Sequence, residues 1–246
     1  MKKLIILLFL ILPLPLGGCE DTDVTLLVDA GIDAVRAVSL SEEEVAELSA
    51  QAINHMDSDN SLAPPDSPYA KRLARLLEQK SGTEGRYEVR VYLKQEVNAF
   101  AMGDGSIRIY SGLMDMMDDN ELLFVIGHEM GHVAKDHVRK KMQVAYAGSA
   151  IRKGLASQNN AAGAVAASLV GGFAQKLINA QFSQHEEREA DDYGLAYLKR
   201  NDLNGQAAVG ALQKLATLGK GHSFLSSHPA PGQRAARLEA VLLKNV

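Results

Sequence analysis

The sequence predicts an α+β fold that is mostly helical and contains one small, largely antiparallel sheet. Two patterns predict it. Apolar residues recur at helical spacing over long segments, whereas between residues 87 and 110 they alternate with polar residues. The 246 residues are 46% hydrophobic, which is enough for one sizeable core. Because the net charge is −4 and no basic patch is interleaved with aromatic residues, nucleic acid is not an expected partner.

The N-terminal segment MKKLIILLFLILPLPLGGCE has the pattern of an export signal. Two lysines precede an apolar run that is too short to span a membrane, and small residues follow before Cys19, the sole cysteine. Leu16-Gly17-Gly18-Cys19 resembles the lipobox of bacterial lipoproteins. This resemblance implies a signal peptide of residues 1–18 and acylation of Cys19, which would attach the chain to a membrane. The alternative is an ordinary secretory signal in which Cys19 is incidental.

The segment after Cys19 bears on location and domain organisation. Glu20 follows the cysteine, whereas Asp at that position is the familiar signal for retention in the inner membrane. We therefore expect a cell-envelope lipoprotein in the outer membrane, facing the periplasm, rather than in the inner membrane. Residues 19–40 are interpreted as the acylated cysteine and a tether, and residues 41–246 as a single domain.

Two helices should precede the sheet. Ser41-Glu42-Glu43-Glu44 fits a capping box, and apolar residues follow at helical spacing as far as Met56. After a Pro-rich loop, a second helix should cover residues 67–80. The alternating segment then predicts three strands with a Gly-containing turn before the last, at residues 87–93, 97–102 and 107–110.

The second half of the chain should be helical. Asp118 and Glu121 are an N-cap signal for a helix expected to cover residues 119–145. Residues 144–180 are rich in Ala, Gly, Ser and Asn, and are interpreted as helical or mobile lid material near the site, with a membrane-contacting hairpin as the alternative. Further helices are expected over residues 179–201, 205–218 and 231–244.

The stretch His128-Glu129-Met130-Gly131-His132 is an HExxH motif. On a helix, residues four apart share a face, so both imidazoles can reach one metal ion. Glu129 projects about 100° round from His128 and can take a proton from the attacking water without binding the metal. Zinc suits this chemistry, but a catalytic zinc centre needs a third protein ligand and an open position.

Two candidates for this further ligand lie downstream. His137 should point about 140° away from His132 on a continuous helix, so it is interpreted as a packing residue or a partner of a ligand. Glu187 is the better candidate, because it shares a helical face with Asp191, which can orient a ligating histidine through its other ring nitrogen. The neighbouring Glu186 and Glu189 are interpreted as solvated charges. If Glu187 is not the ligand, His185 is the next candidate.

HExxH followed by ExxAD, here Glu187 to Asp191, resembles the M48 (Ste24/HtpX-like) family of zinc metallopeptidases. Other segments agree with this family: Tyr110-Ser111-Gly112-Leu113, and SHPAP before Arg234. The resemblance implies a zincin-like peptidase domain over residues 41–246. It also implies one zinc per chain, with His128, His132 and Glu187 as its ligands. By the same resemblance, Glu129 is the general base and Asp191 is the partner of a ligating histidine. The Ste24 and HtpX branches cross the membrane several times, so their membrane chambers are not transferred to this chain.

Asn98, Ala99, Phe100 and Ala101 resemble the edge strand of zinc peptidases, which borders the active-site cleft. Such an edge can bind an extended main chain, so the expected substrates are unfolded, damaged or misassembled envelope proteins. The expected function is zinc-dependent endopeptidase activity in envelope protein quality control, with other envelope proteins as further partners. The alternative is a zinc-containing, chaperone-like or binding lipoprotein with minor peptidase activity, which an intact Glu129 argues against.

Three residues near the C-terminal end are harder to assign. His228 precedes a proline in a loop and has two candidate roles: it donates to the developing oxyanion, or it plugs the open zinc position at rest. It is otherwise an ordinary loop histidine. Arg234 is expected to pair with an acid and hold that loop. Tyr193 has no predicted role.

Overall fold

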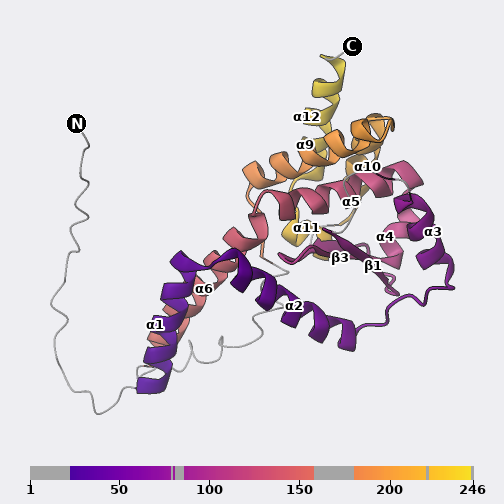
Figure 1. Ribbon diagram of the computed structural model, residues 1–246. Helices are drawn as coiled ribbons and strands as arrows, with labels where there is room; N and C mark the ends of the chain where they lie inside the picture. The colour runs from indigo at the N-terminus through magenta and orange to yellow at the C-terminus, as the bar shows by residue number, and fades with distance from the viewer. Residues whose placement is uncertain (1–22, 79, 81–85, 158–179, 220–221, 245–246) are drawn as a thin grey trace.

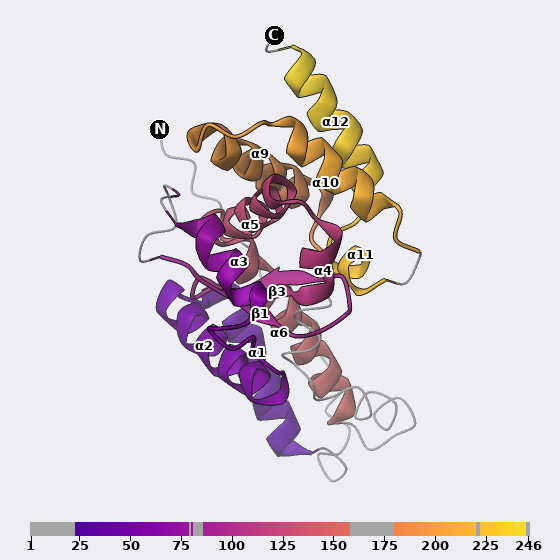
Figure 2. The same ribbon diagram turned by 90° about the vertical axis from the view of Figure 1, so that its right-hand side faces the viewer.

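The computed structural model describes residues 23–78, 80, 86–157, 180–219 and 222–244. The elements form layers around a three-stranded sheet, with helix α5 (Asp119–Ala134) against one face and helix α2 (Glu42–Asp59) against the other (Figure 1). Three further helices pack behind α5 (Figure 2), namely α9 (Gln184–Arg200), α10 (Gln206–Ala216) and α12 (Pro231–Leu243). The mostly helical α+β class predicted from the sequence is confirmed.

The sheet is mixed rather than largely antiparallel, which corrects the prediction. Strands β1 (Glu88–Tyr92), β2 (Ala99–Ala101) and β3 (Ser106–Tyr110) lie in the order β1-β3-β2. A turn that includes Gly105, whose φ is 90°, joins β2 and β3 as an antiparallel hairpin. Because β1 pairs with the other side of β3 and runs parallel to it, the chain crosses the sheet between β1 and β2. Alternation of apolar residues predicts strands but does not determine which strands become neighbours.

The two predicted helices before the sheet begin where the sequence indicated. Ser41 and Glu44 form a reciprocal capping box at the start of α2. The Ser67 side chain accepts from the Ala70 backbone N–H at the start of α3 (Pro68–Leu77), whose first position is a proline. A short helix, α4 (Ser111–Met116), then links β3 to α5.

The long helix expected over residues 119–145 is two helices. Helix α5 begins at the capping box of Asp118 and Glu121 but ends at Ala134, and α6 (His137–Ala156) follows in a new direction. Asp136 lies between them with a φ of 57°, a left-handed conformation that Asp tolerates better than most residues. The break turns the start of α6 back toward α5, so His137 does not have the orientation expected on one continuous helix.

Residues 24–39, within the segment interpreted as a tether, form helix α1 (Val24–Ser39), which packs along α6. These two helices extend together from the body of the molecule, and we refer to them as the α1–α6 arm (Figure 1). Of the Ala/Gly-rich segment interpreted as a lid, residues 158–179 lie outside the described residues.

Two groups of buried apolar side chains hold the body together. The larger group lies between the sheet and helices α3, α5, α9, α10 and α12, and the smaller lies between the sheet, α2 and α6. Burial of this kind is the main stabilising contribution to folding. None of the described helices combines the length and apolarity needed to cross a membrane.

Candidate metal centre

Close packing of α5 against α9 positions the centre. A Cβ atom placed on Gly131 would lie 3.0 Å from the Ala190 Cα, and one on Gly194 would lie 3.1 Å from the His128 backbone nitrogen. These distances are tighter than most real Cβ contacts, so any side chain at either position would push the two helices apart. The two helices therefore lie close enough for a carboxylate on α9 to reach histidines on α5.

Four buried side chains direct ligand atoms to one point. His128, His132, Glu187 and His228 each offer an atom, and these atoms all lie within 4.8 Å of one another. His128 Nε2 lies 3.1 Å from His132 Nε2, and His228 Nδ1 lies 3.0 Å from Glu187 Oε1. Glu187 also lies 3.5 Å from His132 Nε2 and 3.7 Å from His128 Nε2. His185, the reserve candidate, is exposed and pairs with Glu189 instead.

This donor set fits a divalent metal ion such as zinc. A tetrahedral site with metal–ligand distances near 2.1 Å has ligand–ligand separations of about 3.4 Å. The separations observed here, from 3.0 to 3.7 Å, lie on both sides of that value. Three imidazoles and one carboxylate are also the ligand types that zinc prefers.

Electrostatics keep two of these ligands ready to bind a cation. Burial lowers the pKa of His132 well below its usual value, so its ring is neutral. Burial alone would raise the pKa of Glu187, but His228, Arg234 and His132 outweigh it and hold that pKa well below its usual range. A neutral imidazole and an ionised carboxylate need not release protons when a metal binds.

Asp191 and Arg234 surround the ligands on the α9 and α12 side. Asp191 Oδ1 lies 3.1 Å from His128 Nδ1, the ring nitrogen that does not face the ligand cluster. The Arg234 guanidinium donates to both oxygens of Asp191, at 2.6 and 3.0 Å, and also contacts Glu187. Burial would raise the pKa of Asp191, but Arg234 and His128 keep it low, so the carboxylate stays charged. The acid pairing expected of Arg234 thus joins it to the carboxylates of α9.

His137 contacts the centre from the start of α6. Its Nδ1 lies 3.1 Å from His132 Nδ1, and its Nε2 lies 3.2 Å from Glu189 Oε2. Glu189 is therefore not the isolated solvated charge expected from the sequence. Glu186 is half-buried and completes the capping box of Ser183 at the start of α9. The sequence does not show these contacts, because His137 reaches His132 through the break between α5 and α6.

His228 follows the short helix α11 (Ser223–Ser227) and is held by aromatic stacking. Its ring stacks on Phe224 with centroids 4.7 Å apart, and Phe182 stacks on His132 at 3.8 Å. A backbone hydrogen bond of 3.0 Å from Phe182 to Ser227 joins the two segments. The sequence did not indicate Phe182, since an isolated aromatic residue before a helix belongs to no motif.

Glu129 lies beside the ligand cluster and outside it. Its Oε1 is 3.5 Å from His228 Nε2 and has no hydrogen-bond partner among the described residues. Glu129 and His228 line a narrow recess together with residues of the edge strand, α6 and the segments before α9 and α12: Phe100, Ala101, Met102, Val138, Lys141, Phe182 and Ser227. The edge strand β2 thus borders the site, as its sequence predicted.

Lys141 is a second residue of this recess that the sequence did not indicate. Its Nζ lies 4.1 Å from the centre of the Phe182 ring. Burial lowers its pKa to about 8, although Glu129 and Glu187 act in the opposite direction. Its proximity to Glu129 depends on the turn between α5 and α6, which the sequence did not predict.

The outer edge of β2 faces away from the sheet. The Asn98 carbonyl accepts from Tyr110, and the Met102 N–H donates to Ser106, so Asn98, Phe100 and Met102 bond toward β3. In an antiparallel pair the intervening residues then direct their main-chain groups outward. Asn98 Oδ1 already accepts from the Ala99 N–H at 3.0 Å, which leaves the Ala99 carbonyl and the main chain of Ala101 facing away from β3.

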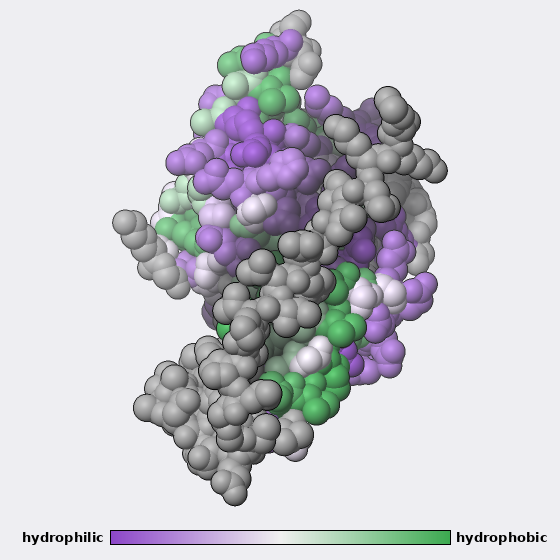
Figure 3. Space-filling model, turned by 90° about the vertical axis from the view of Figure 1, so that its left-hand side faces the viewer, coloured by the Kyte–Doolittle hydropathy of each residue, from purple (hydrophilic) through white to green (hydrophobic). Residues whose placement is uncertain are grey.

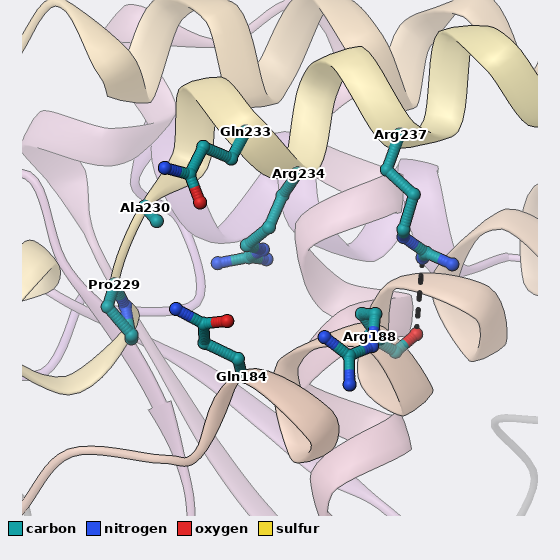
Figure 4. A pocket seen from close by; sticks show the side chains of 7 residues that line it. All are labelled: Gln184, Arg188, Pro229, Ala230, Gln233, Arg234 and Arg237. Atoms are coloured by element: carbon teal, nitrogen blue, oxygen red, sulfur yellow. Dashed lines mark hydrogen bonds between the residues drawn. The ribbon is translucent and has the colours of Figure 1, made fainter.

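A separate pocket lies on the far side of Arg234 (Figure 4). Side chains from α9 and α12 and the loop before α12 line it: Gln184, Arg188, Pro229, Ala230, Gln233, Arg234 and Arg237. Arg237 donates to Asp192 at 2.8 Å and to the Arg188 carbonyl at 3.3 Å. Arg234 thus separates this positively charged pocket from the ligand cluster.

Comparisons with known proteins agree with this geometry. Peptidase family M48 matches residues 68–242. Metalloprotease LoiP of Escherichia coli (strain K12) is 44% identical over 227 residues, which cover 91% of this chain and 90% of LoiP. Metalloprotease YcaL of the same strain is 38% identical over 232 residues, 91% of each chain. The beta-barrel assembly-enhancing protease of Yersinia pestis is 31% identical over 154 residues, which cover 56% of this chain and 31% of that protein. The chain therefore belongs to peptidase family M48 and is a metallopeptidase.

Proposed function

We propose that this metallopeptidase is a zinc-dependent endopeptidase of the bacterial cell envelope that cleaves unfolded, damaged or misassembled envelope proteins. The observation that carries the proposal is the buried group of His128, His132, Glu187 and His228, with Glu129 and the edge of β2 beside it. One zinc per chain would be held by His128, His132 and Glu187. When bound, zinc would act as a Lewis acid and would make water nucleophilic near neutral pH.

The residues around the ligands would orient and move protons. Glu129 takes the proton of the attacking water at Oε1 and passes it to the departing amine. Asp191 fixes the tautomer and orientation of the His128 ring through Nδ1, at 3.1 Å. Arg234 keeps Glu187 and Asp191 ionised and in place. His137 orients the His132 ring in the same way from the side of α6.

The edge of β2 would select extended substrates. The Ala99 carbonyl and the Ala101 main chain can pair with a substrate strand, as exposed sheet edges do in peptide recognition. Phe100 and Ala101 line the recess that also contains Glu129, so a strand bound there runs past the ligand cluster. Compact domains do not offer a free main chain, which is why unfolded segments are the expected substrates.

His228 would occupy the remaining metal position at rest. Its Nδ1 lies 3.4 Å from His128 Nε2 and 3.0 Å from Glu187, within the same ligand group. This position favours the plug over oxyanion stabilisation, although its Nε2 faces Glu129. Substrate would then have to displace His228 before cleavage.

Cys19, which precedes the described residues, would carry the lipid anchor. The lipobox-like segment supports acylation, and Glu20 supports an outer-membrane position facing the periplasm over the inner membrane. One relative is named a beta-barrel assembly-enhancing protease, and a role in protein assembly supports the proposed function in envelope quality control. Labelled fatty acid should be incorporated into the wild-type chain and not into Cys19→Ser; label retained by the variant would contradict this assignment.

Metal analysis tests the ligand assignment. Glu187→Ala should retain much less zinc than the wild type, because it removes the only carboxylate of the group. His185→Ala is the matched control: it lies on the same helix, is exposed, and should retain one zinc per chain. A normal zinc content in Glu187→Ala, or a loss of zinc in His185→Ala, would show that the third ligand is not Glu187.

A comparison of envelope proteins tests the substrate class. Cells with the active enzyme should accumulate new protein termini in misassembled envelope proteins, and cells with Glu129→Gln should not. If cellular function survives Glu129→Gln, the protein acts chiefly by binding, which is the chaperone-like alternative.

A further inference from the structure

Helix α1 carries its apolar residues on the outside. The exposed fractions are 49% for Leu27, 56% for Val28, 47% for Ile32, 61% for Val35 and 81% for Val38. At 100° per residue these five side chains fall within an arc of about 140° that contains no charged residue. We refer to these five residues as the outer face of α1. A helix of a water-soluble domain normally has the opposite arrangement.

The inner face of α1 is held by polar contacts and small residues. Asp33 is buried and pairs with Lys153 of α6 at 2.8 Å, and Ala30 is buried beside it. The Asp23 N–H donates to the Ser157 carbonyl at 2.8 Å, and Arg36 lies over the Tyr146 ring at 5.5 Å. These contacts fix the rotation of α1 about its axis, so the outer face is directed away from α6.

The hydrophobic surface is concentrated on the arm. In Figure 3 the upper part of the molecule is mostly hydrophilic, and hydrophobic surface gathers in the lower part, where Figure 1 has the α1–α6 arm. Contiguous apolar surface of this kind marks a site that contacts another apolar surface.

The position of α1 in the chain indicates which surface that is. Cys19 lies four residues before Asp23, so an anchor at Cys19 holds the start of α1 within about 14 Å of the membrane. An apolar face held at that distance partitions into the lipid interface, as amphipathic interfacial helices do. The absence of charge on the outer face also leaves nothing for a specific polar partner to recognise.

We infer that the outer face of α1 lies in the lipid interface and, together with the anchor, gives the enzyme one fixed orientation on the membrane. This inference rests on the proposed anchor. Because α6 joins α5 directly, through Lys135 and Asp136, orienting the arm also orients the metal centre relative to the lipid surface. The metal centre would then bind its substrates at a fixed height above the membrane.

Fluorescence quenching by brominated lipids tests the inference. The acylated full chain is reconstituted into phosphatidylethanolamine–phosphatidylglycerol vesicles with brominated acyl chains. Since Cys19 is the sole cysteine and its sulfur is acylated, a thiol probe will label only an introduced cysteine. The probe is placed by Val35→Cys, and by Leu243→Cys as the matched control, an apolar residue that is 71% exposed at the end of α12.

The Val35 probe should lose roughly half of its fluorescence or more, because interfacial helices bury their apolar face about 5–10 Å deep. The Leu243 probe should change little. Equal signals from the two probes on attached protein would overturn the inference. A Val35 probe that is shielded equally without vesicles would also overturn it, since a second copy or another part of the chain then covers the face.

A charged variant separates this inference from the peptidase proposal. Val28→Glu/Val35→Glu should abolish a fixed orientation while leaving the cleavage of casein in solution unchanged, and Leu243→Glu should affect neither. If the wild type fails to float with vesicles at all, the anchor and the inference fail together, whereas loss of casein cleavage by Glu129→Gln concerns the peptidase alone.

Discussion

The guanidinium of Arg234 lies between two buried carboxylates, Glu187 and Asp191. Arg234→Gln removes the charge that both carboxylates depend on and leaves them buried beside each other. We expect a loss of about 3–5 kcal/mol in the free energy of unfolding, measured by urea denaturation of the metal-free protein. The matched control is Arg237→Gln on the same helix, where the partly exposed pair with Asp192 should contribute at most about 1 kcal/mol. Similar losses in both variants would mean that Arg234 does not hold the carboxylates.

Lys141 should make stability depend on pH in the alkaline range. Burial lowers its pKa from 10.5 to about 8 in the folded protein. Between these values the unfolded chain holds one more proton than the folded chain, so the free energy of unfolding rises with pH across this window. Lys141→Met removes the titrating group. We therefore expect the stability of the wild type relative to the variant to increase between pH 7 and 10, by about 1.4 kcal/mol per unit of pKa difference.

Thermal or urea unfolding at several pH values measures this difference. Lys140→Met is a suitable control, since Lys140 precedes Lys141 on α6 and is exposed. A wild-type advantage that falls with pH would show that the lysine is charged and stabilising in the folded state.

His228→Ala distinguishes the two roles of that histidine by sign. If His228 blocks the metal position, its removal opens the site and raises the cleavage of casein. If His228 stabilises the oxyanion, its removal lowers kcat by roughly 10²-fold. The position of its Nδ1 within the ligand group predicts the increase. Unchanged cleavage would leave His228 as a structural residue of the loop and would contradict both roles.

At the scale of elements, the contact of α5 with α9 decides whether Glu187 reaches the histidines. Gly131→Ala would place a Cβ 2.9 Å from the Tyr193 Cβ and 3.0 Å from the Ala190 Cα, so the helices must move apart. We expect lower zinc affinity and lower stability, although Ala in a helix is normally favoured over Gly by up to about 1 kcal/mol.

Gly232→Ala is the matched control for this change. It lies on α12, where the nearest atom to an added Cβ is 3.7 Å away, an ordinary contact. It should leave zinc affinity unchanged and stability unchanged or slightly higher. Isothermal titration measures the zinc affinity of both variants. A zinc affinity of Gly131→Ala equal to that of the wild type would show that the spacing of these helices does not position Glu187.

The features predictable from sequence at this scale are those set by local spacing. Ser41, Ser67 and Asp118 cap the helices that follow them, because a capping box needs only a short range of residues. The break at Asp136 was not predictable in this way. The apolar pattern continues across it, and no local pattern marks the left-handed conformation of Asp136.

At the scale of the whole molecule, the site was predictable where residues share a helix and less so where elements meet. The spacing within HExxH puts His128 and His132 on one face of α5, and the spacing within ExxAD puts Glu187 and Asp191 on one face of α9. That these two faces meet was implied by the resemblance to family M48. The strand order β1-β3-β2 and the position of Lys141 depend on tertiary contacts, and the sequence did not predict them. The helix in residues 24–39 was missed although its apolar residues recur at helical spacing, because the segment after Cys19 was interpreted as a tether.

We propose that α5 and α9 hold the metal and that Glu129 activates the attacking water. The rate of casein hydrolysis by zinc-loaded Glu129→Gln tests it most directly, because the substitution keeps the size of the side chain and the ligand group but removes the base. The variant should bind one zinc per chain and cleave at least about 10²-fold more slowly than the wild type. Cleavage at the wild-type rate by the zinc-loaded variant would show that Glu129 is not the general base.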